Sequence, residues 1–204
     1  MCERNHGKKR AVPVKKENNP IIVKAVEKMG FRYVYGAIIS EVYRYIKVFP
    51  NSDPLMGLIL PAARNEPRWK APLLAFSTMF IFDIFTSGIG AWTWVTSATY
   101  ALIALAFSLF LKGRKMGLRG YLGAGTAGVL AFDFITGPVM SSVLFQQSFI
   151  LTAIMQVPFT VMHLVSAAFS ILIITPFLDK DIAAEMNAYV QAAKAAMVNW
   201  RVQQ

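Results

Sequence analysis

The chain has 204 residues, of which 55% are hydrophobic and 16% are charged, whereas about a quarter of the residues of a soluble globular domain are charged. A soluble single domain is therefore a poor description of this chain. Its 21 Lys and Arg against 11 Asp and Glu give a net charge of +10, and most basic residues lie outside the apolar stretches. This pattern is typical of membrane proteins with basic loops and argues against a nucleic-acid partner. The single cysteine, Cys2, excludes an intrachain disulfide and a thiolate metal cluster.

The first 30 residues form a basic segment that we expect to be a cytosolic arm. Residues 1–20 are rich in Asn, Lys and Pro, a composition that cannot bury enough apolar surface to fold. We therefore expect residues 1–20 to be a solvated, disordered tail.

The segment before residue 71 predicts two irregular helices. Residues 31–48 include Glu41 and Arg44, yet apolar residues recur there every three or four positions. This spacing predicts a membrane helix whose charges face inward or reach the interface. An interfacial amphipathic helix is the alternative. Residues 54–63 are apolar and short, and they predict either a half-helix or a tightly packed short crossing.

Two long apolar stretches each predict a pair of membrane helices, because a helix needs about 20 apolar residues to cross the bilayer. Residues 71–111 contain one charge, Asp83, and are broken at Ser87-Gly88-Ile89-Gly90. Residues 120–178 contain one charge, Asp133, and are interrupted near Gly137-Pro138 and again at Gln146-Gln147-Ser148.

The distribution of Lys and Arg predicts the topology. Six crossings with the amino terminus inside place the basic clusters of the loops on the cytosolic side, where such residues collect, and only Arg44 and Lys47 oppose the rule. We therefore expect an all-α, polytopic protein of the cell membrane, with a six-transmembrane-helix bundle over residues 31–178 and both termini cytosolic. Residues 179–204 repeat apolar side chains at helical spacing and predict an amphipathic cytosolic helix.

A seven-residue segment occurs twice in the apolar region. Phe82-Asp83-Ile84-Phe85-Thr86-Ser87-Gly88 is followed 50 residues later by Phe132-Asp133-Phe134-Ile135-Thr136-Gly137-Pro138. Counting ~1.5 Å per residue places both aspartates at similar depth in the outer half of the membrane. An ionisable group at that depth needs a cavity or a partner, which indicates a polar site that opens outward. The alternative is structural, with each Asp hydrogen-bonded to Thr86 or Thr136 and capping the next turn.

Two other patterns favour packing over chemistry. Gly123-Ala124-Gly125-Thr126-Ala127-Gly128 matches the dinucleotide-binding GxGxxG pattern but lacks its strand context. The spacing of Gly120, Ala124, Gly128 and Ala131 predicts instead a small-residue face for close helix packing. His163 has no second ligand at helical spacing, which favours a buried, hydrogen-bonded histidine over a metal ligand.

Aromatic residues follow the first copy of the repeat. Trp92, Trp94 and Tyr100 suit an aromatic belt at the outer interface or stacking on a flat bound ring. The sequence contains no nucleophile or metal motif of a membrane enzyme, so we expect no catalytic residue, metal or cofactor.

Four stretches together carry a resemblance to a known family. They are Phe49-Pro50-Asn51-Ser52-Asp53-Pro54-Leu55-Met56-Gly57, the Asp83 helix with its glycine turn and Trp-bearing helix start, the second repeat copy, and Gln156-Val157-Pro158-Phe159-Thr160-Val161-Met162-His163-Leu164-Val165-Ser166-Ala167-Ala168 continuing to Thr175-Pro176-Phe177-Leu178. Over residues 33–178 the chain resembles the substrate-binding S components of energy-coupling factor (ECF) transporters.

The resemblance implies a six-helix membrane subunit that binds a vitamin or related micronutrient from outside. It also implies partners, namely a transmembrane coupling subunit and two cytosolic ATPases, which would hydrolyse the ATP. The first helix of the family often carries an Ala-x-x-x-Ala face for the coupling subunit. The nearest match here is Gly36-x-x-x-Ser40, with small residues other than Ala and with Glu41 beside it.

We therefore expect a pocket between the loop at residues 51–53 and the outer ends of the later helices. The candidate substrate-binding residues are Asp53, Asp83, Trp92, Trp94, Asp133, Gln146 and Gln147, and the candidate partner-docking residues are Gly36 and Ser40. Acids beside tryptophans suit a flat cationic ring. The competing hypothesis is a non-transporting membrane scaffold. A scaffold should be filled by Phe, Leu and Met where a binding subunit has a cavity lined by both repeat aspartates.

Overall fold

The computed structural model describes residues 20–46 and 53–202, which form helices joined by short connections, with no strand among them. The predicted all-α class is confirmed. In chain order the elements are α1 (Pro20–Ile46), α2 (Met56–Asn65), α3 (Lys70–Thr86), α4 (Ala91–Leu111), α5 (Leu118–Phe134), the π-helical turn η1 (Ile135–Val139), α6 (Met140–Phe145), α7 (Phe149–Ile173), α8 (Thr175–Leu178) and α9 (Lys180–Val202).

Three helical stretches in the described part of the chain are long and apolar enough to cross a membrane. They are Ala91–Leu111, Leu118–Phe145 and Phe149–Leu178. Large apolar side chains on them are exposed, including Leu102, Phe110, Ile150 and Ile154. An apolar surface of this kind is unfavourable in water and favourable in lipid. Both observations support a membrane protein.

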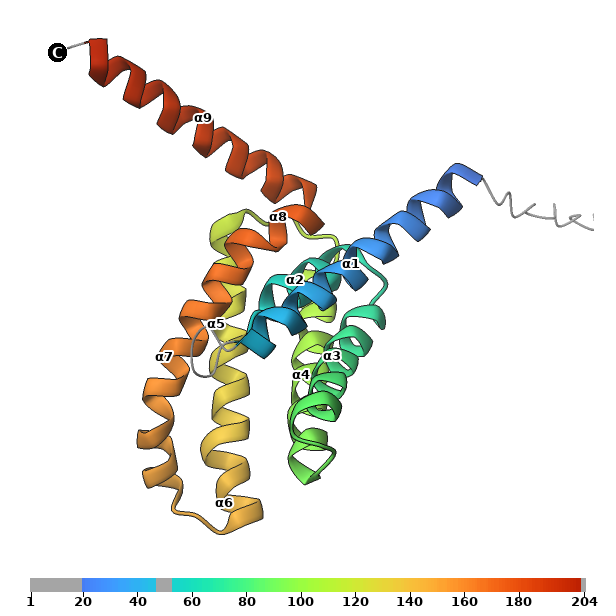
Figure 1. Ribbon diagram of the computed structural model, residues 1–204, viewed down its shortest axis with the longest axis vertical. Helices are drawn as coiled ribbons and strands as arrows, with labels where there is room; N and C mark the ends of the chain where they lie inside the picture. Colours follow the sequence, from blue (N-terminus) through green and yellow to red (C-terminus); the bar gives the residue numbers. More distant parts are fainter. Residues whose placement is uncertain (1–19, 47–52, 203–204) are drawn as a thin grey trace, which may run out of the picture.

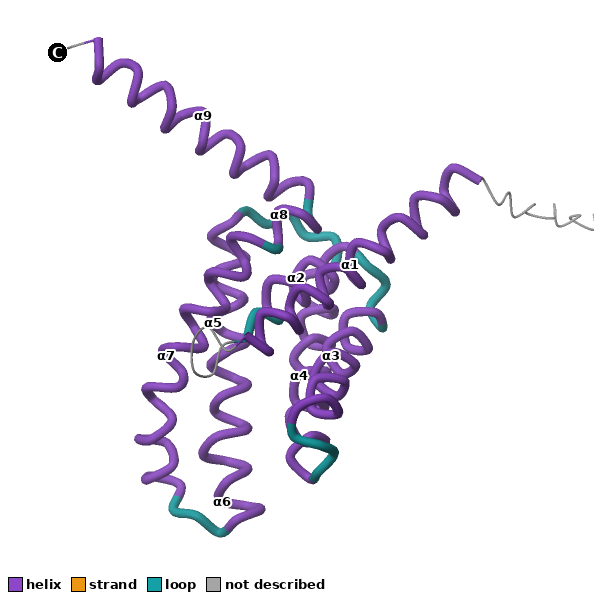
Figure 2. Tube along the Cα trace, viewed as in Figure 1, coloured by secondary structure: helices purple, strands orange, loops and turns teal. Residues whose placement is uncertain are grey.

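Two antiparallel hairpins form the body of the protein (Figure 1). One hairpin pairs α3 with α4, and the other pairs α5 and α6 with α7. The short helix α2 lies between them and contacts α3, α4, α5 and α7. Figure 2 shows the connections that follow α3 and α6 at one end of the bundle, and those that follow α2 and α4 at the other end. We call these the repeat end and the basic end, because the second holds Arg64, Arg68, Lys70, Lys112, Arg114 and Lys115.

The helix α2 spans only about half of the bundle. Its ten residues measure ~15 Å, against ~30 Å for a full crossing. It starts beside Tyr100 and His163, midway along α4 and α7, where Asp53 contacts Tyr100. It ends at the α4–α5 connection, where the Gly113 N–H donates to the Arg64 carbonyl at 3.1 Å. Of the two alternatives for residues 54–63, the half-helix is the one observed, and the sixth full crossing is therefore not present at this segment.

Protein surrounds α2 on every side, which explains why its sequence is apolar all round. Every residue from Met56 to Arg64 is buried. A side chain on Gly57 would meet the Ser170 carbonyl oxygen at 2.4 Å, and one on Gly128 would meet Met56 at 2.8 Å. The predicted small-residue face of α5 is thus confirmed at Gly128, while Gly125, against Ile171, is a close contact that the prediction did not include.

Two charges of α1 face inward. The Arg44 and Glu41 side chains are 9% and 22% exposed, whereas Ile38, Val42 and Tyr45 are exposed on the other side. The prediction of an inward charged face is confirmed at Glu41 and Arg44, while Arg32 is exposed. The helix begins at Pro20, so no element boundary occurs at residue 30, where the basic arm was expected to end. Residues 1–19 lie outside the described residues. So do residues 49–52, the first part of the stretch Phe49–Gly57 that carries the family resemblance.

The expected interruption at Gly137-Pro138 is a π-helical turn within one continuous helix from Leu118 to Phe145. Such turns accommodate an extra residue and are frequent at functional sites. The helix ends at Gln146, which has a positive φ of 52°.

The helix α9 leaves the bundle at the basic end (Figure 1). Ile182 is buried against the body of the protein, but Tyr189, Met197 and Trp200 of the predicted apolar stripe are exposed. The amphipathic helix predicted for residues 179–204 is present, and only its first turns contact the bundle.

Candidate functional site

A cavity of about 710 Å³ lies between the two hairpins. Its wall is formed by α1, by Asp53 just before α2, and by α3 to α7, from Arg44 on α1 to His163 on α7. The lining also includes Ser87 and Trp92, which are exposed beside the α3–α4 turn. The cavity is therefore reached from the repeat end.

A buried chain of four polar side chains crosses the inner end of this cavity. The Tyr100 hydroxyl donates to Asp53 Oδ2 at 2.6 Å and lies 3.1 Å from His163 Nε2. His163 Nδ1 is 2.9 Å from Asp133 Oδ1. The four residues are at most 7% exposed. The chain links the segment just before α2 to α4, α7 and α5, so it connects the two hairpins through hydrogen bonds.

A count of protons constrains the charge of this chain. Because the single hydroxyl proton of Tyr100 goes to Asp53, His163 Nε2 must donate to the Tyr100 oxygen. The contact between Nδ1 and Asp133 then needs one further proton, carried either by the imidazole or by Asp133. The His163–Asp133 pair is neutral overall in both arrangements.

The two copies of the repeat have matching local structure. The Thr86 hydroxyl donates to the Phe82 carbonyl, and the Thr136 hydroxyl donates to the Phe132 carbonyl, each at 2.8 Å. The threonines are therefore bonded four residues back and not to the aspartates. Instead, Asp83 and Asp133 line the same cavity from opposite hairpins. The structural alternative, in which each Asp bonds its threonine, is not observed.

The structure brings four of the predicted binding residues together, because Asp53, Asp83, Trp92 and Asp133 all line the cavity. It places the other three elsewhere. Trp94 points about 200° around α4 from Trp92 and packs on Phe80, with ring centroids 5.1 Å apart. Gln146 and Gln147 are exposed in the α6–α7 connection, outside the cavity lining.

The cavity also contains residues that sequence reasoning left out of the site. Gln156 lies against Gly137, where a side chain on that glycine would meet Gln156 Oε1 at 2.8 Å. His163 was correctly expected to be buried and hydrogen-bonded, but its partners lie 30 and 63 positions away, so spacing gave no signal. Tyr100 is fully buried, which makes its assignment to an aromatic belt wrong.

The partner-docking candidates lie inside the chain itself. Gly36 and Ser40 are buried, and a side chain on Gly36 would meet Leu58 at 2.9 Å and Leu178 at 3.7 Å. This face of α1 is thus covered by α2 and α8.

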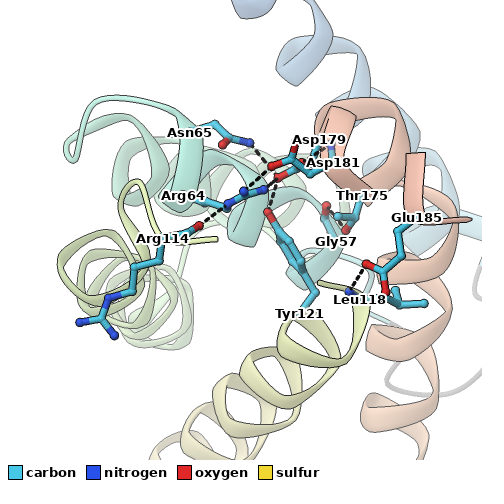
Figure 3. Close-up of polar contacts among 10 residues, drawn as sticks. All are labelled: Gly57, Arg64, Asn65, Arg114, Leu118, Tyr121, Thr175, Asp179, Asp181 and Glu185. Atoms are coloured by element: carbon cyan, nitrogen blue, oxygen red, sulfur yellow. Dashed lines mark hydrogen bonds and ion pairs between the residues drawn. The ribbon is translucent and has the colours of Figure 1, made fainter. Parts of the chain in front are cut away.

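A second polar cluster fixes α2 at the basic end (Figure 3). Arg64 forms ion pairs with Asp179 and with Asp181, the latter at 2.5 Å. Tyr121 donates to Asp179 at 2.5 Å and Asn65 donates to it at 3.0 Å. Asp179 Oδ1 accepts from the Asp181 N–H at 3.0 Å, so Asp179 caps the start of α9. This cluster joins α2 and α5 to the start of α9.

The environment of Asp179 favours its charged form. Burial raises its pKa, but hydrogen bonds from Tyr121, Asn65 and Arg64, together with the charge of Arg64, outweigh burial and leave the pKa below its ordinary value. The cluster is therefore an ionised structural anchor at neutral pH.

The described residues contain no group of three His, Cys, Asp or Glu side chains that could hold a metal ion. No protein-family model, curated protein or solved structure matches the chain. The function is therefore inferred from the site itself.

Proposed function

We propose that this protein is a membrane-embedded substrate-capture subunit that binds a vitamin or related micronutrient from outside for uptake. The observation that carries the proposal is the cavity of about 710 Å³ lined by both repeat aspartates. Its volume lies within the range of ~300–1,000 Å³ typical of small-molecule sites. Buried acids at membrane depth cost several kcal/mol without a role, and a site for a ligand supplies one.

Charge supports the orientation of the subunit. The basic residues of the α2–α3 and α4–α5 connections lie at the end opposite the repeat end. Lys and Arg collect in cytoplasmic loops, so the basic end and both termini are cytosolic in this proposal. The cavity then faces outward. In this topology α1 and the half-helix α2 form one excursion into the membrane, followed by the two hairpins.

The proposed partners are those that the resemblance to ECF S components implies. A transmembrane coupling subunit and two cytosolic ATPases would supply the energy, because this sequence has no phosphate-binding loop. Burial of Gly36 and Ser40 by α2 and α8 means that the coupling subunit would contact other residues.

The scaffold hypothesis accounts less well for the site. A scaffold gains nothing from a cavity bordered by Asp53, Asp83 and Asp133, whereas a filled apolar interior would stabilise it. The exposed apolar residues of α9 are the one feature that a scaffold would use, and they are equally compatible with a subunit that binds cytosolic partners.

Mass spectrometry and thermal unfolding test the proposal. The full chain is purified in mild detergent, denatured, and the released small molecules are identified; in parallel, water-soluble vitamins are screened for thermal stabilisation. We expect one compound to be released or to stabilise the protein, and we expect Asp133→Asn to weaken the effect. Asp181→Asn, at the basic end, is the matched control and should not change it. A folded protein that releases nothing and is stabilised by nothing in the screen contradicts the proposal.

A further inference from the structure

One buried atom in the cavity wall needs a hydrogen-bond donor from a ligand. Asp133 is 3% exposed, and its Oδ1 faces His163 at 2.9 Å. Its Oδ2 is buried and receives no hydrogen bond from any residue that the structure describes. A buried acceptor without a donor costs ~1–3 kcal/mol. Because Asp133 lines the cavity, a ligand N–H or O–H that reached this oxygen would supply the missing donor.

The charge on the cavity wall is negative. Asp53 accepts only from neutral donors, the Leu55 N–H and the Tyr100 hydroxyl. None of the ion pairs formed among the described residues includes Asp53 or Asp83. Arg44 also lines the cavity, but its guanidinium is already 3.6 Å from Glu41. Since the His163–Asp133 pair is neutral, two aspartates remain without a cation.

The remaining wall suits an organic ring. Phe82, Trp92, Phe132 and Phe159 line the cavity, and aromatic faces attract cations as well as planar rings. The structure already contains one such contact, because the Arg44 guanidinium lies 3.8 Å from the centroid of the Phe82 ring. A bare metal ion fits poorly, since the acids are spread around the wall and do not form a ligand group within the described chain.

The geometry points to an organic cation as the ligand: a planar, positively charged ring system with an N–H donor that binds Asp133 Oδ2, while Asp53 and Asp83 balance its charge. Arg44, which also lines the cavity, then repels the ligand. This assignment rests on the proposed capture function and names the substrate class for it.

One ring in three charge states tests the assignment directly. Thermal unfolding of the purified full chain is measured with 1-methylnicotinamide, a cation, with nicotinamide, which is neutral, and with nicotinate, an anion, each at millimolar concentration. We expect stabilisation in the order cation, neutral, anion. Equal or greater stabilisation by the neutral or anionic probe, or none by the cation, overturns the assignment.

Two variants that each remove one charge from the cavity wall should change the affinity for a cationic ligand in different ways. Asp83 is half-buried and outside the buried hydrogen-bonded chain, so Asp83→Asn should fold and should weaken binding of 1-methylnicotinamide about tenfold. Arg44→Gln should leave that binding unchanged or strengthen it, and Asp181→Asn should not alter it. The opposite result, in which Asp83→Asn strengthens binding and Arg44→Gln weakens it, indicates an anionic ligand and overturns the assignment.

The vitamin screen separates the two proposals. If an acidic or neutral vitamin stabilises the protein and the cationic probe does not, the capture function stands and the cation assignment fails. If neither the screen nor the probe series produces stabilisation of a folded protein, both fail.

Discussion

The Tyr100 hydroxyl contacts both Asp53 and His163, and Tyr100→Phe removes it without changing the packing of the ring. The ring is fully buried and packs against Phe132 in a tilted arrangement, with centroids 4.1 Å apart. The variant therefore keeps the apolar contacts and deletes two hydrogen bonds. It measures what the polar connection between the hairpins contributes to stability.

The expected loss follows from the two partners left behind. Each buried polar group that loses its partner costs ~1–3 kcal/mol, and both Asp53 and His163 are affected. Both residues also line the cavity, so water entering from the repeat end can replace part of each hydrogen bond. Double-mutant cycles in a membrane protein give at most ~1.7 kcal/mol per hydrogen bond. We therefore expect Tyr100→Phe to lower the free energy of unfolding by about 2 kcal/mol.

The assay is reversible unfolding of the purified protein in mixed micelles of mild detergent and SDS. Tyr189→Phe is the matched control, because its hydroxyl is exposed and donates to Glu185 at only 3.3 Å. The control should stay within ~0.5 kcal/mol of the wild type, as exposed substitutions do. If Tyr100→Phe is no more destabilising than Tyr189→Phe, the chain does not hold the hairpins together.

Three further changes probe α2 and its anchor by the same unfolding measurement or by thermal unfolding. Arg64→Met leaves Asp179 buried without its cation and should lower the free energy of unfolding by about 3 kcal/mol. This is the low end of the range for broken buried ion pairs, because neutral hydrogen-bond donors to Asp179 remain. The folded pKa of Asp179 lies below its ordinary value of 3.8. Its contribution to stability is therefore present above about pH 4 and is lost as the pH falls through the folded pKa. The midpoint of thermal unfolding should drop over that acid range, and it should drop less in Asp179→Asn. Gly57→Ala should lower the free energy of unfolding by about 1–3 kcal/mol, because the new methyl group meets Ser170. Gly123→Ala is the control and should not lower it, because there is open space around Gly123.

Hydrophobic patterning was sufficient to find the helices. The breaks at Ser87-Gly88-Ile89-Gly90 and Gln146-Gln147-Ser148 were both identified, because glycine and polar clusters end apolar runs in predictable ways. The Gly137-Pro138 pair misled the prediction, since a π-helical turn accommodates proline without ending the helix. The half-length of α2 followed from neither composition nor charge, because residues buried by protein and residues buried by lipid have the same apolar sequence.

The sequence repeat identified two of the four predicted residues that line the cavity, and Asp53 and Trp92 were identified without it. Asp83 and Asp133 were found because the chain contains their surroundings twice. Arg44 and Tyr100 enter the site through tertiary contacts with segments far away in the sequence, which no spacing rule reaches. Gln146 and Gln147 were chosen because they are polar within an apolar stretch, yet polarity there marks the connection between two helices.

The half-length of α2 also explains why a cavity exists at this place. At the basic end α2 separates the two hairpins by one helix diameter, ~10 Å or more, and the Arg64 cluster fixes it there. Among the residues that the structure describes, no helix lies between the hairpins on the side of Asp53 that faces the repeat end, and the cavity occupies that space. A cylinder of that width needs a depth of only about 9 Å to hold the observed volume of about 710 Å³. The cavity thus occupies the space that continues the line of α2 toward the repeat end, with Asp53 at its inner end. Its two long walls carry the repeated aspartates because each hairpin supplies one copy.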